Sequence, residues 1–179
     1  MTALIQLARV ADVVSRACGA VATAAVLLAC LISAGNAVSR YALGLTSNAW
    51  LEVQWYLFAA IALLGAAETL RRSGHVRVDL LYSLASERGR IWIDLFGLAL
   101  FLIPGMLLLA WLSWPFFWES WIRWEISNNP GGLLRWPVKV LLPLGFALLV
   151  VQGLAEIVKR VAALKGAFSL DTSYNRPLQ

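Results

Sequence analysis

The chain has 179 residues, of which 60% are hydrophobic and 14% are charged, against roughly 25% charged residues in soluble domains. A mean hydropathy of +0.73 excludes an ordinary soluble domain and leaves little polar sequence for a second unit, so we predict one membrane domain. The formal charge of +5 does not indicate a nucleic-acid partner, because the basic residues stand at the ends of apolar runs.

Four apolar stretches follow one another along the chain, at about residues 17–38, 50–70, 91–114 and 137–158. Each has roughly 21 to 24 residues, enough for a helix to cross a hydrocarbon core of about 30 Å. We therefore predict an all-α integral membrane protein with four transmembrane helices in residues 1–164, followed by a polar tail at 165–179.

The first stretch contains both cysteines, Cys18 and Cys30. A helix separates them by about 18 Å, too far for a disulfide between them. Residues 27–30 (LLAC) also resemble a lipoprotein cleavage box, but the following residues stay apolar where a polar tether would be expected. The sequence favours an uncleaved span in which Cys30 is a small packing residue.

Polar residues mark the link between the first two stretches. Arg40 follows the first span and Glu52, two residues after Trp50, opens the second, so a hairpin places both at one membrane boundary. They could form an ion pair, or each could extend separately into water. Asn36 lies one turn before Arg40, where its amide could hydrogen-bond to a neighbouring helix.

At the other end of the second stretch, Glu68 and Arg72 are four residues apart, which predicts an ion pair on one helix face. Apolar residues with helical spacing follow at Val78, Leu81, Tyr82 and Ala85. We predict an interfacial helix between spans two and three within residues 75–90. His75 lies among arginines and is expected to be a loop residue rather than a pH sensor.

The third stretch ends in an aromatic stripe with spacings of three and four, formed by Trp111, Trp114, Trp118 and Trp121. Anchoring at the membrane interface is the favoured interpretation, and a partner-docking surface is the alternative. Glu119 and Arg123, at i and i+4, support a helix here. Residues 128–132 (NNPGG) then end it, and Pro137 suits the start of the fourth helix.

Basic residues are unequally divided between the two ends of such a bundle. Eleven lie on the side of the N-terminus: Arg9, Arg16, Arg71, Arg72, Arg77, Arg88, Arg90, Lys159, Arg160, Lys165 and Arg176. Four lie on the other side: Arg40, Arg123, Arg135 and Lys139. The positive-inside rule therefore predicts that both termini are cytoplasmic, and eight of the nine tryptophans map to the outer end.

No group of residues suggests catalysis, a cofactor or a metal. Nothing is arranged as a nucleophile, an acid–base pair or a phosphate loop, and a single histidine leaves no His/Cys cluster and no bis-His haem site. The spans also lack the interrupted repeats of many secondary carriers. We therefore expect a helper of a larger membrane partner rather than an enzyme.

Two other functions stay open from the residues alone. One is a small carrier or channel formed by self-association, with Glu52 or Glu68 lining a shared path. The other is a membrane anchor for a redox enzyme, with a quinone near the Trp-rich outer end. The first predicts transport by this chain alone, and the second predicts a dehydrogenase partner.

Several ordered elements resemble one known family. They are NAVSRY at residues 36–41, WLE at 50–52, Gly65, and RRSGHVRVDLL at 71–81. In this order, within a four-span chain, they resemble the small membrane subunit (DctQ-like) of tripartite ATP-independent periplasmic (TRAP) transporters over about residues 17–160. The family often carries two adjacent acids where this chain has Glu52 and Val53.

The resemblance implies a bacterial inner-membrane complex. Its other members would be a large permease subunit, which holds the sodium and substrate sites and moves substrate by an elevator-like motion, and a periplasmic substrate-binding protein. This chain would extend the static scaffold in contact with membrane lipid and help receive the binding protein. Residues 125–139 and 143–146 are similar to a subgroup associated with 2-oxo acids and related organic acids.

The resemblance also assigns structural roles to named residues. Arg40, Trp50 and Glu52 would form the outer docking side. The inner loop would be held by Arg72, His75, Arg77 and Asp79. No residue receives a catalytic, cofactor-binding or metal-binding role.

Overall fold

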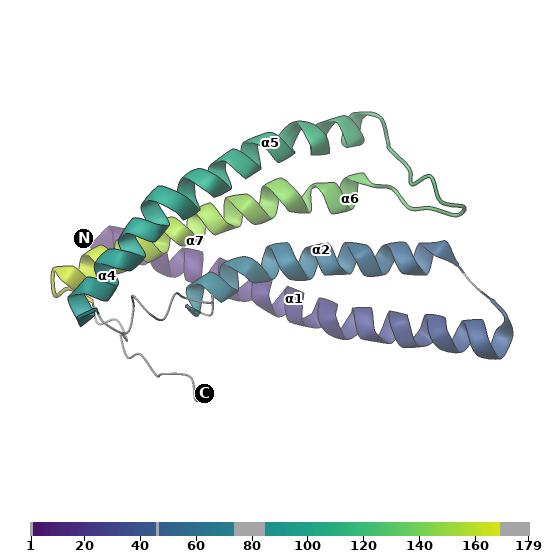
Figure 1. Cartoon of the computed structure of the whole chain (residues 1–179), viewed down its shortest axis with the longest axis horizontal. Coiled ribbons are helices and arrows are strands. Elements are labelled where there is room, and N and C mark those ends of the chain that lie inside the picture. Colours follow the sequence, from purple (N-terminus) through teal and green to yellow (C-terminus); the bar gives the residue numbers. More distant parts are fainter. Residues whose placement is uncertain (1, 46, 74–84, 169–179) are drawn as a thin grey trace.

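The computed structural model describes residues 2–45, 47–73 and 85–168 (Figure 1). Its elements in chain order are α1 (Thr2–Leu43), α2 (Asn48–Arg71), α4 (Glu87–Phe96), the π-helical turn η1 (Gly97–Leu102), α5 (Ile103–Ile122), α6 (Trp136–Lys139) and α7 (Leu141–Leu164). In these ranges the regular structure is helical, apart from one isolated antiparallel bridge between Ile126 and Leu134.

Among the described residues, four helices are long and apolar enough to cross a membrane: Thr2–Leu43, Asn48–Arg71, Glu87–Ile122 and Trp136–Leu164. The prediction of an all-helical chain with four such helices is therefore confirmed. Each helix encloses one predicted apolar stretch and continues beyond it. The longest has 42 residues, or about 63 Å of helix, so it exceeds a hydrocarbon core of about 30 Å.

Other sequence predictions concern residues outside the described ranges. Most of the predicted interfacial helix and most of the polar tail lie there, at residues 74–84 and 169–179. The end of that predicted helix, residues 87–90, belongs to α4, at the start of the long helix Glu87–Ile122. The sidedness of the termini and the membrane bounds of each span remain predictions.

The helices run side by side, and α7 lies at the centre of the bundle (Figure 1). It contacts α1, α2 and α5, and it carries the largest set of buried residues. The start of α1 and the end of α7 lie at one end of the molecule, which we call the termini end. The link between α1 and α2 and the segment 123–135 lie at the other, which we call the loop end.

Small residues allow the helices to approach closely. A Cβ placed on Gly145 of α7 would lie 2.6 Å from the Cβ of Leu63 on α2 and 3.1 Å from its carbonyl oxygen. A Cβ on Gly19 of α1 would lie 2.8 Å from the Cβ of Glu68. Glycine therefore sets the distance between α2 and its two neighbours, as is common where membrane helices pack.

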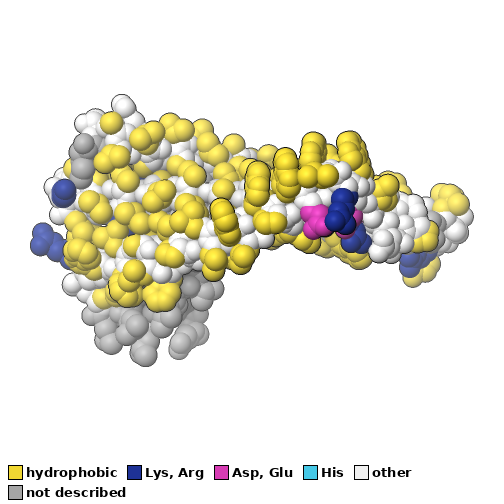
Figure 2. Space-filling view, turned by 90° about the horizontal axis from the view of Figure 1, so that it is seen from above, with side chains coloured by type: hydrophobic (Ala, Val, Ile, Leu, Met, Phe, Trp, Pro, Cys, Tyr) yellow, Lys and Arg dark blue, Asp and Glu magenta, His cyan; other side chains and the backbone are white. Residues whose placement is uncertain are grey.

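The outer surface of the bundle is apolar. The side on which α5 lies is covered with hydrophobic side chains along most of its length, with one cluster of acidic and basic side chains (Figure 2). Large residues such as Phe101, Leu108 and Trp111 stand exposed there. A continuous apolar surface of this size is unfavourable in water and suits contact with lipid or with another membrane protein.

Candidate functional site

Glu52 lies at the loop end and hydrogen-bonds to the segment 125–135. It lies in the second turn of α2, and the residue is only 3% exposed. Oε1 accepts hydrogen bonds from Ser127 Oγ and from Asn129 Nδ2, the latter at 2.7 Å. Oε2 accepts one from the backbone N–H of Leu133 at 2.7 Å. One carboxylate thus holds both arms of the segment 125–135.

The same segment is fixed at further points. Tyr56, one turn after Glu52, donates its hydroxyl to the carbonyl of Leu134 at 2.7 Å. The N–H of Arg135 donates to the carbonyl of Glu125 at 2.8 Å, which closes the segment. Gly131 has a φ of +70°, and a Cβ on Gly132 would lie 2.6 Å from the Cβ of Ser127, so the tight turn requires glycine.

Glu125 joins the segment to the start of the fourth span. Lys139 Nζ donates to Glu125 Oε2, and Arg135 Nη1 lies 3.3 Å from Oε1. The hydrogen bond from Lys139 is the main cause that lowers the pKa of the Glu125 carboxyl below its ordinary value. Lys139 also lies 3.9 Å above the ring centre of Phe116 on α5, a cation–π contact.

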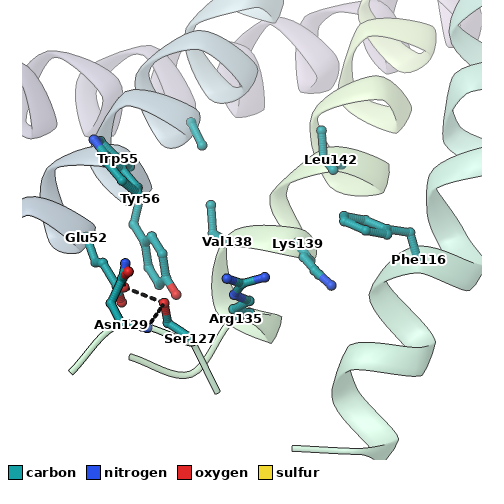
Figure 3. A pocket seen from close by; sticks show the side chains of 11 residues that line it. Glu52, Trp55, Tyr56, Phe116, Ser127, Asn129, Arg135, Val138, Lys139 and Leu142 are labelled. Carbon is teal, nitrogen blue, oxygen red and sulfur yellow. Dashed lines mark hydrogen bonds between the residues drawn. The ribbon is translucent and has the colours of Figure 1, made fainter. Parts of the chain in front are cut away.

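A cavity of about 380 Å³ opens between α2, α5 and the start of the fourth span (Figure 3). Its lining is Glu52, Trp55, Tyr56, Ala59, Phe116, Ser127, Asn129, Arg135, Val138, Lys139 and Leu142. The lining is mainly apolar, and its charged groups are engaged with one another or with the loop. This cavity can hold an apolar group.

Arg40 and Glu52 do not form an ion pair. Both oxygens of Glu52 are occupied by loop donors, and Arg40 is exposed, with no ion pair among the described residues. The alternative, in which both side chains extend separately into water, agrees with the structure for the exposed Arg40 but not for Glu52, which is 3% exposed. Asn36 is half-buried, and its amide makes no hydrogen bond to another described residue. Trp50, in the first turn of α2, is half exposed.

Three members of the predicted tryptophan stripe make ring contacts with other tryptophans. Trp114 and Trp118 are stacked at 6.4 Å between ring centres, and Trp121 meets Trp136 edge to face at 4.6 Å. Trp118 and Trp121 both remain partly exposed. The Glu119–Arg123 pair predicted from its spacing is present at 2.9 Å.

At the termini end, Glu68 is paired as its spacing predicts. Its carboxylate contacts Arg72 Nε at 2.5 Å and also Arg71 Nε at 2.6 Å. The predicted inner-loop residues His75, Arg77 and Asp79 lie outside the described residues. Arg72 is therefore the one predicted inner-loop residue whose contacts are described.

The structure also shows a charge network that the sequence interpretation missed. Lys159 of α7 contacts Asp12 of α1 at 2.7 Å and Glu156 at 2.5 Å, and Arg160 contacts Asp94 of α4 at 3.0 Å. Gln152 donates to Asp12 at 3.0 Å and accepts from Ser15 at 2.7 Å. A signal was present, because Gln152, Glu156, Lys159 and Arg160 recur at i, i+4, i+7 and i+8 on an otherwise apolar helix.

These groups form two polar layers across the bundle. Glu52 and Glu68 are sixteen residues apart on α2, about 24 Å of helix, and Lys139 and Lys159 are twenty residues apart, about 30 Å. This spacing matches the thickness of a hydrocarbon core of about 30 Å. Among the described residues, no cluster of three His, Cys, Asp or Glu side chains could hold a metal ion.

Apolar spans between two layers of mutually paired charges define a small helical membrane protein whose polar residues hold the fold together. Residues 29–163 match the family model of the DctQ component of tripartite ATP-independent periplasmic transporters. The chain therefore belongs to this family, and the resemblance predicted from residues 36–81 is confirmed.

A characterised relative is the C4-dicarboxylate TRAP transporter small permease protein DctQ of Pseudomonas aeruginosa. It is 31% identical over 134 residues, which cover 73% of this chain and 61% of the relative. The chain thus spans less than two thirds of that protein's length. No solved structure matches this chain significantly.

Proposed function

We propose that this chain is the small membrane subunit of a sodium-driven TRAP transporter for organic acids in a bacterial inner membrane. Its partners are a large permease subunit, which holds the sodium and substrate sites, and a periplasmic substrate-binding protein. The family match over residues 29–163 is the observation that carries this proposal. Sodium-dependent uptake that requires all three proteins is its test.

The proposed role within the complex is to enlarge the static scaffold of the permease. Two features support it. Ion pairs join α7 to α1 and to α4 at the termini end, and Glu52 of α2 holds the segment 125–135 at the loop end, which favours fixed positions for these elements. The exposed apolar surface of α5 and α1 offers area for lipid and for a large membrane partner.

The loop end is the proposed docking side for the binding protein. Arg40 and Trp50 stand exposed on the hairpin between α1 and α2, and Glu52 holds the neighbouring loop in one conformation. Trp118 and Trp121 would set the depth of this end in the membrane interface. A rigid, partly charged surface suits repeated encounters with a soluble partner.

The arrangement gives less support to a self-contained carrier or channel. That function needs Glu52 or Glu68 to face a shared path. Glu52 is instead enclosed by three loop donors, and Glu68 by two arginines of its own helix. The substrate class rests on the similarity of residues 125–146 to an organic-acid subgroup and on the C4-dicarboxylate named for the relative.

The docking role of Arg40 is tested by Arg40→Glu in the complete complex. Reversing a charge at the edge of an interface mainly slows association, so we expect sodium-dependent uptake to fall several-fold at limiting binding protein. Membrane insertion should be unchanged. The matched control is Arg9→Glu, the same reversal at an exposed arginine of the termini end, which should leave uptake near normal. Unchanged uptake with Arg40→Glu removes Arg40 from the docking side.

A further inference from the structure

A groove of about 590 Å³ runs between α1 and α2 near the termini end. Small residues form its floor: Gly19, Ala20, Ala22, Ala62, Gly65 and Ala66. Arg16, Glu68 and Arg72 line one end, and Val26 and Ile61 lie toward the other. Thr23 and Thr69 also line the groove, and their hydroxyls donate to carbonyls of their own helices. The groove is thus charged at one end, and small residues and internally bonded threonines line the rest of it.

The charged end has an excess of positive charge. Glu68 is the acid in the lining, and it is shared by Arg71 and Arg72, while Arg16 is exposed with no ion pair among the described residues. The guanidinium-bearing side chain of Arg72 is 69% exposed. Asp12, the other nearby acid on α1, is engaged by Lys159 and Gln152 of α7. An anion between Arg16 and Arg72 would therefore meet two cations that no acid fully neutralises.

The length of the groove along the two helices matches the thickness of one leaflet of a bilayer. Arg16 and Val26 are ten residues apart on α1, or about 15 Å of helix, and Arg72 and Ile61 are separated by a similar length of α2. Half of a hydrocarbon core of about 30 Å is the same distance. Arg72 binds Glu68 in the polar layer at the termini end, so the groove runs from that layer toward the bilayer centre.

We propose that this groove binds one anionic phospholipid, with its phosphate between Arg16 and Arg72 and one acyl chain along the small residues. The two arginines recognise the charged head, and the apolar floor accepts the chain. A helix of a partner protein fits less well, because it would cover Arg16 and needs an acid of its own to pair with it. This inference does not depend on the transport role.

The test is native mass spectrometry of the full-length chain in detergent, with phosphatidylglycerol or phosphatidylcholine of identical acyl chains. We expect one phosphatidylglycerol to be retained, with about tenfold preference over phosphatidylcholine, as expected for a charge-assisted contact. Arg16→Gln with Arg72→Gln should reduce that retention about tenfold. Ala62→Phe, which fills the groove without changing charge, should reduce it as well.

Matched controls separate the groove from general charge and bulk. Arg9→Gln with Arg88→Gln removes the same charge from exposed positions outside the groove, and Ala24→Phe adds the same ring to an exposed site on α1; both should retain the lipid. Arg16→Gln alone breaks no ion pair among the described residues, so it keeps the test valid if the double variant unfolds.

Any of four results would overturn the proposal. Two concern selectivity: equal retention of both lipids, or normal retention by Arg16→Gln and by the double variant. The third is displacement of the lipid when the large permease subunit binds, because this would assign the groove to a partner helix. Soluble glycerol phosphate bound equally by the original chain and by Ala62→Phe would indicate a site for a free phosphate and would also contradict it. None of these results bears on uptake, so they leave the proposed function untouched.

Discussion

Glu52 is a single carboxylate that accepts hydrogen bonds from a segment 75 to 81 residues later in the chain. Its neighbour is Val53, so no second acid competes for the donors or repels the first charge. Because backbone and side-chain donors both converge on it, the carboxylate holds the loop more firmly than a neutral acceptor would. Glu52 therefore makes three of the contacts that hold the segment 125–135.

Glu52→Gln tests the role of these contacts. Glutamine keeps the size of the side chain but replaces one acceptor oxygen with an N–H₂ group, which would face another donor. We expect the amide of Leu133 to exchange hydrogen about tenfold faster or more, because its charged acceptor is weakened. Hydrogen exchange across residues 125–135 measures the effect.

The matched control is Glu119→Gln, an acid at the same end whose ion pair with Arg123 is exposed to solvent. Exchange in residues 125–135 should stay unchanged in that variant. Unchanged exchange at Leu133 in Glu52→Gln would show that the carboxylate does not hold the loop.

The sequence predicted some pairs and could not predict others. Glu68 with Arg72, and Glu119 with Arg123, were predictable because helix geometry alone brings residues i and i+4 together. The partners of Glu52 were not, because they depend on how a loop of irregular backbone folds back over α2. Neither option for Arg40 and Glu52, a mutual ion pair or separate extension into water, describes Glu52, because its partners lie 75 to 81 residues later in the chain.

At the scale of helices, hydropathy predicted the four spans but not their contacts. The spacing of Gln152, Glu156, Lys159 and Arg160 places them on one face of α7, but it does not show which helices that face meets. In the structure they face α1 and α4 instead of water. Which face of a membrane helix meets another helix is weakly encoded by hydropathy, since lipid is as apolar as a protein interior.

Gly145→Ala tests the close contact between α2 and α7. The added Cβ would lie 2.6 Å from the Cβ of Leu63 and near its backbone, so the two helices must separate. We expect the free energy of unfolding to fall by about 1 to 3 kcal/mol, the usual cost of overpacking. Unfolding of the full chain in detergent, followed by steric trapping, measures it.

The control is Gly105→Ala on α5, where nothing lies within 4 Å of the added Cβ. This change should be neutral or stabilising by up to about 1 kcal/mol, because alanine is the better helix former. If Gly145→Ala behaved in the same way as Gly105→Ala, the contact would not limit the packing of α2 on α7.

For the whole molecule, the two polar layers and the distribution of basic residues predict one orientation, with the termini end cytoplasmic. Single cysteines in a background with Cys18→Ala and Cys30→Ala can test it. Asn128→Cys lies in the exposed segment at the loop end, and Lys165→Cys follows α7 at the termini end.

We expect a membrane-impermeant maleimide to label Asn128→Cys in intact spheroplasts and to label Lys165→Cys only after permeabilisation. The two variants act as controls for each other, because both positions are exposed in the structure. The reverse pattern would place the termini outside and would exchange the proposed docking side with the opposite end.

The central claim is that this chain works as the small subunit of a three-part transporter. Proteoliposomes with a sodium gradient can compare three compositions: this chain alone, the proposed large permease subunit with the periplasmic binding protein, and all three proteins together. Substrates to test are 2-oxo acids and C4-dicarboxylates. The account predicts uptake only when all three are present and a sodium gradient is imposed. Uptake by this chain alone, or full uptake without it, would contradict the account.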